Sequence, residues 1–301
     1  MIIDLPETTT ETVNKKLVEL RETGGAVTLG RVLTLVVSAD SANSEAVIEA
    51  ANEASREHPC RVIVVTRGGR DGESRLDAQI RVGGDAGASE VVVLRLSGEL
   101  AGHESSVVVP FLLPDTPVVA WWPGDAPAVP ARDPLGQLAI RRITDATGTT
   151  DPTATIKSRL DSYTAGDTDL AWSRTTPWRA LLTSAMDQPP HEKLVSATVS
   201  GLAEEPAIDL IAGWLASRID GPVRRRVGIP TVDLERETGS VSLSRPQTGK
   251  TATLSRSGAP DALVSLARRE TRDCLAEELR RLDPDEIYRA ALAGLSRVIY
   301  E

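Results

Sequence analysis

A strand–helix–strand unit near the beginning of the chain constrains the fold more than any other feature of the sequence. Residues 31–37 (RVLTLVV) and 61–66 (RVIVVT) are short, apolar and rich in β-branched side chains, which is typical of strands buried on both faces. Between them, residues 43–57 carry apolar side chains at helical spacing, and Pro59 ends the pattern. Because such crossovers join parallel neighbours in one sheet, the sequence predicts a βαβ unit.

The rest of the first half extends this unit into a larger domain. Period-2 or apolar patterns predict further strands at residues 74–82, 90–96 and 118–122, and a capping-box spacing predicts a first helix at residues 8–21. We therefore expect a Rossmann-like α/β domain with a mixed sheet over residues 1–165.

The second half, residues 166–301, predicts another α/β domain. Pro177 occupies the first turn of an expected helix, residues 193–202 form an expected strand, and residues 206–219 form a strongly apolar helix. Short alternating segments follow and predict an antiparallel meander with one face in water: residues 223–229, 231–237, 240–245 and 251–256. Two helices, beginning near residues 271 and 285, are expected to complete the domain.

Charge and hydropathy exclude several classes of partner. The 301 residues carry a formal net charge of −9, which repels nucleic acid and anionic lipid at long range. No apolar run reaches the ~18–20 residues that span a bilayer, and the N-terminus lacks the pattern of a secretory signal. Two cysteines cannot form a disulfide framework. We expect a cytoplasmic protein with no nucleic-acid partner and no membrane association.

The sequence offers little catalytic machinery. Its three histidines are scattered singly, and no HExxH, CxxC or GxSxG motif is present. Residues 247–251 (QTGKT) resemble the end of a phosphate-binding loop, but Ser244 stands where the first glycine is required and a strand pattern follows. We therefore expect no catalytic residue, no metal site, no cofactor and no enzymatic activity.

Tryptophan is the most distinctive contact residue in this chain, which has only nine aromatic residues. Four of the five tryptophans lie between residues 121 and 178, two of them with arginine neighbours. Buried Trp and Arg side chains dominate association energies, so one hypothesis is a partner-binding surface. The other hypothesis is packing between two domains. The residues concerned are Trp121, Trp122, Trp172, Arg174, Trp178 and Arg179.

Cys60 has two interpretations as well. Its position at the start of an apolar strand, after Pro59, indicates a small packed side chain. Its neighbours His58 and Arg61 could instead lower the pKa of the thiol and make it a redox-responsive residue.

Four blocks of sequence together resemble the glucose-6-phosphate dehydrogenase assembly protein family, often called OpcA. The blocks are residues 58–63 (HPCRVI), 113–123 (LPDTPVVAWWP), 168–172 (TDLAW) with 177–179 (PWR), and 277–285 (EELRRLDPD). Their order and joint presence make the resemblance specific, although each block alone is short. The Ala-, Arg- and Asp-rich composition resembles an actinobacterial member.

The resemblance implies a non-catalytic protein that binds glucose-6-phosphate dehydrogenase and acts as an assembly factor or allosteric activator. It further implies a hetero-oligomer with that enzyme, and support for the oxidative pentose phosphate pathway and NADPH supply. An alternative from another class is a regulatory module that senses a nucleotide or a sugar phosphate at the βαβ unit. The residues after Val37 lack the glycine-rich turn that such a site uses.

Overall fold

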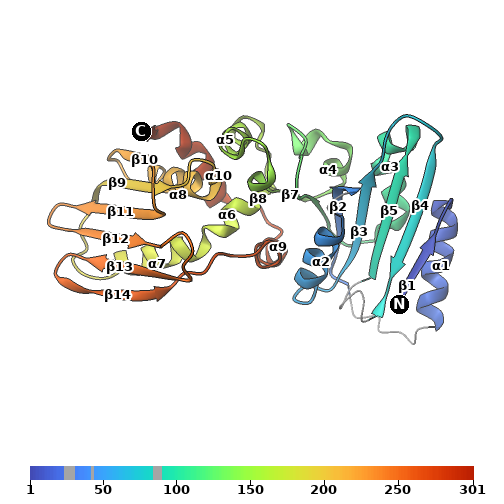
Figure 1. Ribbon diagram of the computed structural model, residues 1–301, viewed down its shortest axis with the longest axis horizontal. Helices are drawn as coiled ribbons and strands as arrows, with labels where there is room; N and C mark the ends of the chain where they lie inside the picture. Colours follow the sequence, from blue (N-terminus) through green and yellow to red (C-terminus); the bar gives the residue numbers. More distant parts are fainter. Residues whose placement is uncertain (24–30, 42–43, 84–89) are drawn as a thin grey trace. The chain divides into compact units, whose positions relative to one another are not determined.

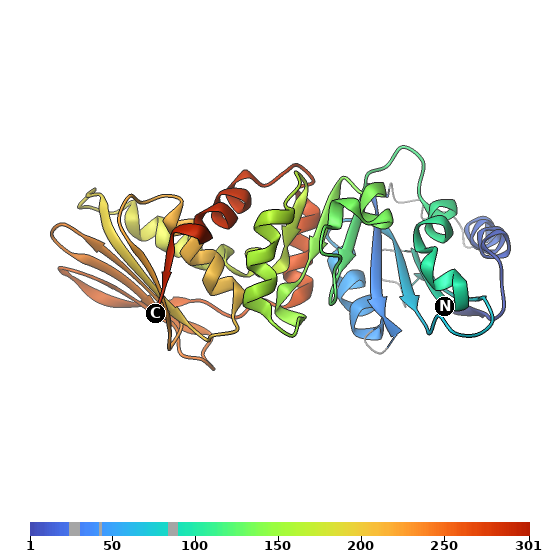
Figure 2. The ribbon, with the colours of Figure 1, turned by 90° about the horizontal axis from the view of Figure 1, so that it is seen from above.

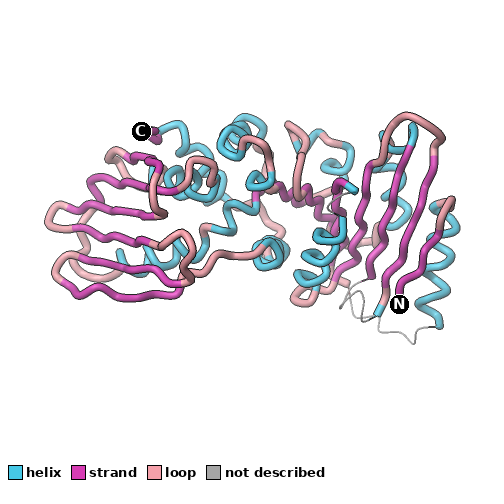
Figure 3. Tube along the Cα trace, in the orientation of Figure 1, coloured by secondary structure: helices cyan, strands magenta, loops and turns pink. Residues whose placement is uncertain are grey.

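The computed structural model describes residues 1–23, 31–41, 44–83 and 90–301. The first residue of the expected helix 43–57 therefore lies outside the described residues. The chain divides by its internal contacts into two compact units. Unit 1 comprises Met1–Thr144 and Thr271–Pro284, and unit 2 comprises Asp145–Glu270 and Asp285–Glu301. Each unit contains one sheet with helices packed on it, which confirms the expected α/β class (Figures 1 and 3).

The sheet of unit 1 is mixed, as expected. Its strand order is β1–β4–β5–β3–β2–β6–β7. Strands β5, β3, β2, β6 and β7 run parallel, whereas β4 and β1 are antiparallel to their neighbours. The strands are β1 (Ile2–Leu5), β2 (Leu33–Asp40), β3 (Cys60–Arg67), β4 (Arg75–Arg81), β5 (Glu90–Ser97), β6 (Val118–Trp122) and β7 (Arg141–Thr144).

Helices cover both faces of this parallel core, which explains why β2 and β3 are apolar along nearly their whole length. Helix α2 (Ser44–Ser55) packs on β2 and β3, and α1 (Thr10–Thr23) and α3 (Glu104–Val108) lie on the other side of the sheet (Figure 1). Val13 and Leu17 of α1 join one buried cluster with side chains of the strands. A short helix, α4 (Pro134–Leu138), follows β6.

Helix α9 (Thr271–Arg280) belongs to unit 1 although it comes late in the sequence. It packs on α2, where Arg272 lies 2.7 Å from Glu53 and Arg280 lies 2.9 Å from Glu57. These contact-defined units differ in extent from the expected domains, 1–165 and 166–301, which stay a prediction.

Unit 2 contains a seven-stranded sheet with the order β14–β13–β12–β11–β9–β10–β15. An antiparallel meander runs from β9 through β11, β12 and β13 to β14, and three of its strands, β11, β12 and β13, are strands of the expected meander. The strands are β9 (Leu194–Gly201), β10 (Val223–Val227), β11 (Thr231–Arg236), β12 (Ser240–Ser244), β13 (Thr251–Arg256), β14 (Ala259–Ser265) and β15 (Val298–Tyr300). The short strand β8 (Asp167–Asp169) also lies in unit 2.

One expected strand of the meander is placed differently. Residues 223–229 were expected to run antiparallel, but β10 pairs parallel with β9 and with β15. The cause is α8 (Pro206–Ala216), which carries the chain from β9 to β10 as a crossover, so that these three elements form a second βαβ unit.

Helices α7 (Thr176–Met186) and α8 lie over one face of this sheet (Figure 2). Helix α10 (Glu286–Gly294) packs on α8 at very short range, since a Cβ added to Gly294 would come within 2.0 Å of the Gly213 carbonyl oxygen. The remaining helices of unit 2 are α5 (Pro152–Ser162) and α6 (Leu170–Arg174).

The opposite face of the unit 2 sheet carries short polar side chains in register. One row across four strands is Thr198, Asp233, Ser242 and Ser255, and the next is Ser200, Thr231, Ser244 and Thr253. All eight are partly exposed, and only one of them is charged. We call these eight residues the hydroxyl face.

Candidate functional site

The four tryptophans proposed from the sequence as partner contacts are buried. Trp121, Trp122 and Trp172 are 1% exposed and Trp178 is 4% exposed. Trp122 belongs to the core of unit 1, and Trp178, on the buried side of α7, belongs to the core of unit 2. A partner could reach these indoles only if the surrounding core opened. Their role in this structure is packing, and a partner-binding role for them stays a prediction.

The arginines of the same group are held in fixed geometry inside unit 2. Arg174 at the end of α6 donates two hydrogen bonds of 2.8 Å to the two carboxylate oxygens of Asp145 and a third, of 3.1 Å, to Thr147. Such a bidentate pair fixes orientation as well as charge. Arg179 lies 3.7 Å above the ring of Trp172, in cation–π geometry. Both guanidinium groups therefore contact residues of unit 2.

Trp172 connects two sequence blocks that are far apart in the chain. Its indole Nε1 donates a hydrogen bond of 2.8 Å to Asp285, and its ring lies 5.9 Å from that of Tyr288. Asp285 also caps α10, because its other carboxylate oxygen accepts from the backbone N–H groups of Ile287 and Tyr288. The TDLAW and EELRRLDPD blocks therefore meet in one structural junction of unit 2, which explains their joint presence.

The EELRRLDPD block has a second structural role, in unit 1. Glu278 is buried and forms an ion pair with the buried Arg141 of β7. Arg141 also donates a hydrogen bond of 2.8 Å to the backbone oxygen of Asp283. This arrangement anchors α9 in unit 1.

Cys60 lies at the beginning of β3 and is completely buried. Its neighbour Arg61 is engaged with Glu90, at 2.9 Å, and with the backbone oxygen of Phe111, at 2.6 Å. Access for an oxidant and a nearby uncommitted cation are the two requirements of a reactive thiol. The described surroundings of Cys60 favour packing, and the redox role stays a prediction.

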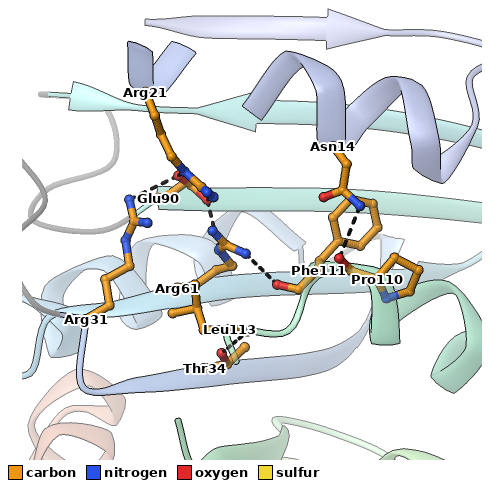
Figure 4. Close-up of polar contacts among 9 residues, drawn as sticks. All are labelled: Asn14, Arg21, Arg31, Thr34, Arg61, Glu90, Pro110, Phe111 and Leu113. Carbon is orange, nitrogen blue, oxygen red and sulfur yellow. Dashed lines mark hydrogen bonds and ion pairs between the residues drawn. The ribbon is translucent and has the colours of Figure 1, made fainter. Parts of the chain in front are cut away.

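Glu90 is the centre of a buried ionic cluster at the start of β5 (Figure 4). It is 2% exposed, and Arg21, Arg31 and Arg61 approach its carboxylate at 2.8, 3.0 and 2.9 Å. The three arginines come from α1, from the residues before β2 and from β3. A single carboxylate thus links three segments of unit 1 where the parallel strands begin.

The carboxyl ends of the parallel strands, where open α/β sheets bind ligands, contain a small pocket. Its volume is about 140 Å³, and its lining includes Arg67, Glu104 and Asp133. Arg67 lies 2.6 Å from Glu104, and Ser38 donates a hydrogen bond of 3.3 Å to the same carboxylate. Burial raises the pKa of Glu104, and Arg67 opposes this effect. Binding pockets for small molecules commonly measure ~300–1,000 Å³, so this one is small for a nucleotide.

A larger pocket lies in unit 2, between the C-terminal halves of α7 and α8 and above β9 and β11. Its volume is about 400 Å³. Trp214 of α8 lines it and is half-buried, in contrast to the four tryptophans above. Sequence reasoning missed Trp214 because it lies outside the tryptophan-rich stretch, in a helix read only as core. Its place after Gly213, on the edge of the apolar stripe, was the available signal.

Two kinds of feature were not found in the part of the chain that the structure describes. No group of three or more His, Cys, Asp or Glu side chains is arranged to hold a metal ion among these residues. None of the helices described is both long enough and apolar enough to cross a membrane.

Comparison with protein families gives two matches in chain order. The model described as glucose-6-phosphate dehydrogenase subunit N-terminal domain (OpcA) matches residues 51–161. The model for the C-terminal domain of the same subunit matches residues 165–292. Together the two matches cover most of the chain. Comparison with curated proteins gave no significant match.

Three solved structures are similar at low sequence identity. A mutant of KijD10, a 3-ketoreductase from Actinomadura kijaniata in complex with TDP-benzene and NADP, is 12% identical, with a TM-score of 0.48 over 90% of this chain and 100% of that chain. The aldose-aldose oxidoreductase from Caulobacter crescentus is 10% identical, with a TM-score of 0.46 over 88% and 96%. The biliverdin reductase from Synechocystis sp. PCC 6803 is 9% identical, with a TM-score of 0.43 over 89% and 96%. At these scores the likeness says nothing about function.

Proposed function

The chain belongs to the glucose-6-phosphate dehydrogenase subunit (OpcA) family, and on that premise we propose that it binds glucose-6-phosphate dehydrogenase and promotes the assembly or activity of that enzyme. The observation that carries the proposal is the match of both domain models of one family, in order, along the chain. The protein is not itself a catalyst. By this role it supports the oxidative pentose phosphate pathway and the supply of NADPH.

The physical mechanism we propose is a shift of population. A protein that binds one oligomeric or active conformation of the dehydrogenase more tightly than the others raises the fraction of that conformation. A twofold change in rate needs only ~0.4 kcal/mol of differential binding. We propose a cytoplasmic hetero-oligomer with the dehydrogenase, in an actinobacterial cell.

The contact surface needs side chains that are accessible, and the hydroxyl face of unit 2 meets this requirement. Charged residues make up 26% of the chain, and only Asp233 is charged among these eight residues, although Arg224 and Arg226 of β10 continue the two rows beside Thr198 and Ser200. Depletion of charge is typical of the central part of protein interfaces. Internal hydrogen bonds, such as Ser242 to Asp233 at 2.6 Å, hold the side chains in place. We therefore propose that the dehydrogenase docks on this face.

The test is co-elution of the two purified proteins in size-exclusion chromatography. Thr198→Arg and Ser255→Arg introduce a long cation at the two ends of one row of the hydroxyl face. We expect each to weaken the complex at least tenfold. Ser184→Arg is the matched control, because Ser184 is exposed on α7, on the helical side of the sheet.

The outcomes separate the function from the docking surface. Independent elution of the wild-type chain and the dehydrogenase would overturn the proposed function. If Thr198→Arg and Ser255→Arg bind the dehydrogenase as tightly as the wild type does, the proposed docking surface is wrong, but the proposed function is not affected. Circular dichroism of each variant establishes that the fold is retained.

The nucleotide- or sugar-phosphate-sensing alternative depends on the pocket near Arg67 and Glu104. Its volume of about 140 Å³ and the carboxylate in its lining disfavour a phosphorylated ligand. Calorimetric titration of the isolated protein with NADP(H) and with glucose 6-phosphate tests this alternative. Saturable heat that Arg67→Gln abolishes would support it, whereas the absence of heat with either ligand would eliminate it.

A further inference from the structure

We propose that the pocket between α7 and α8 binds a small organic acid with an apolar body, that is, an aliphatic or aromatic carboxylate. This inference goes beyond the proposed function and does not depend on it. The pocket lies wholly within unit 2, and its volume of about 400 Å³ is in the range of small-molecule sites. It is also the larger of the two pockets described above.

The interior of the pocket is apolar. Its walls and floor come from four elements, α7, α8, β9 and β11, so that the cavity is framed by the core of unit 2. Trp214 and Met186 are half-buried at its edge, where a polarisable ring and thioether can adapt to an apolar ligand. The apolar lining residues are Leu182, Met186, Leu194, Trp214, Leu215, Ile219 and Leu234.

The rim of the pocket carries an excess of positive charge. Lys193 and Arg218 are exposed, line the pocket, and make no ion pair among the described residues. Asp220 is the single carboxylate in the lining. In a chain of net charge −9, a rim with two cations and one anion is a local exception. An apolar interior with a positive rim fits a ligand whose apolar body ends in a carboxylate.

The test uses octanoate as the probe, in calorimetric titration of the full chain below the micellar concentration. We expect saturable binding of octanoate, and at least tenfold weaker binding of butyrate, because the shorter acid buries fewer methylene groups. Octylamine has the same apolar body with a positive charge, and we expect it to bind at least tenfold more weakly than octanoate. The double variant Lys193→Gln, Arg218→Gln should weaken octanoate binding about fivefold.

A pair of neighbouring substitutions locates the binding site. Thr183 and Ser184 are both exposed on α7, but only Thr183 lines the pocket. Thr183→Phe places a ring in the cavity and should abolish octanoate binding, while Ser184→Phe should leave it unchanged.

Three results would each overturn the proposal. These are no saturable heat with octanoate, equal affinity for octylamine, or equal effects of Thr183→Phe and Ser184→Phe. The fold of each variant is followed by its thermal unfolding midpoint. Co-elution with the dehydrogenase is measured separately, so failure of this site and failure of the proposed function remain distinguishable.

Discussion

At the scale of single residues, each unit contains buried charged side chains that are paired within that unit. Glu90 forms ion pairs with three arginines in unit 1, and Asp145 and Arg174 form a bidentate pair in unit 2. Removing one partner of such a contact leaves the other charge desolvated and unpaired, which costs more than the contact contributes. Arg174 and Arg179, the two arginines proposed from the sequence as partner contacts, therefore make structural contacts within unit 2.

Glu90→Gln is expected to lower the free energy of unfolding by about 3 kcal/mol, because three guanidinium groups would lose their shared carboxylate. Urea unfolding of the purified variant measures this loss. Glu99→Gln is the matched control, since Glu99 is exposed and its effect should stay within about 0.5 kcal/mol. Equal stability of the two variants would show that the cluster contributes nothing.

Glu104 makes stability depend on pH in a direction opposite to that of an ordinary paired carboxylate. Burial raises its pKa above the usual value of 4.5, against the opposing effects of Arg67 and Ser38. The folded state therefore holds a proton that the unfolded state releases, so the free energy of unfolding falls as pH rises through the interval above 4.5. Burial also raises the pKa of Asp209, which adds to the same trend.

Glu104→Gln removes one of these titrating groups. We expect its unfolding free energy, measured by urea titration at a series of pH values above 4.5, to fall less steeply than that of the wild type. Parallel curves for the two proteins would contradict the raised pKa.

At the scale of elements, the closest helix contact in unit 2 depends on two glycines. A Cβ on Gly294 would lie 2.0 Å from the Gly213 carbonyl oxygen, so Gly294→Ala forces α10 away from α8. We expect a loss of about 1–3 kcal/mol of unfolding free energy. Gly228→Ala is the control, because the nearest atom, the Ser200 Cβ, is 3.7 Å away. If both variants melt at the same temperature, α8 and α10 are not held by close packing.

The sequence predicted the elements whose own pattern determines them and missed those set by distant contacts. The apolar runs of β2 and β3 located the parallel core to within three residues at each end, because burial on both faces leaves a continuous signature. The direction of β10 was wrong because alternation alone does not distinguish a parallel from an antiparallel partner. The packing of α9 on α2 depends on side chains about 220 residues apart in the chain, which no local pattern reveals.

The candidate site was predicted less well than the fold. Composition located the tryptophans, but exposure depends on what the fold places around each ring. Trp122 lies in β6, a strand whose residues are all buried, while Trp214 lies at the edge of an apolar helix stripe, beside a pocket. Only three-dimensional packing separates the two cases.

At the scale of the whole molecule, the chain consists of two α/β units. The helix-bearing segment Thr271–Pro284 belongs to unit 1, although the chain on either side of it belongs to unit 2. Both family matches fall on these units, and the sequence blocks that resemble the family form internal contacts around Arg141 and Trp172. A scaffold of this kind acts through its surface. The hydroxyl face and the α7–α8 pocket are the two surfaces to which we assign a role, one for the dehydrogenase and one for a small acid.

The central claim is that this protein changes the behaviour of glucose-6-phosphate dehydrogenase without turning over a metabolite itself. The most direct test is the steady-state rate of NADPH formation by the purified dehydrogenase, titrated with the purified chain, with the chain alone as the blank. We predict a saturable change in kcat or KM at stoichiometric amounts and no NADPH from the chain alone. An unchanged dehydrogenase, or turnover by the chain alone that one substitution abolishes, would contradict the claim.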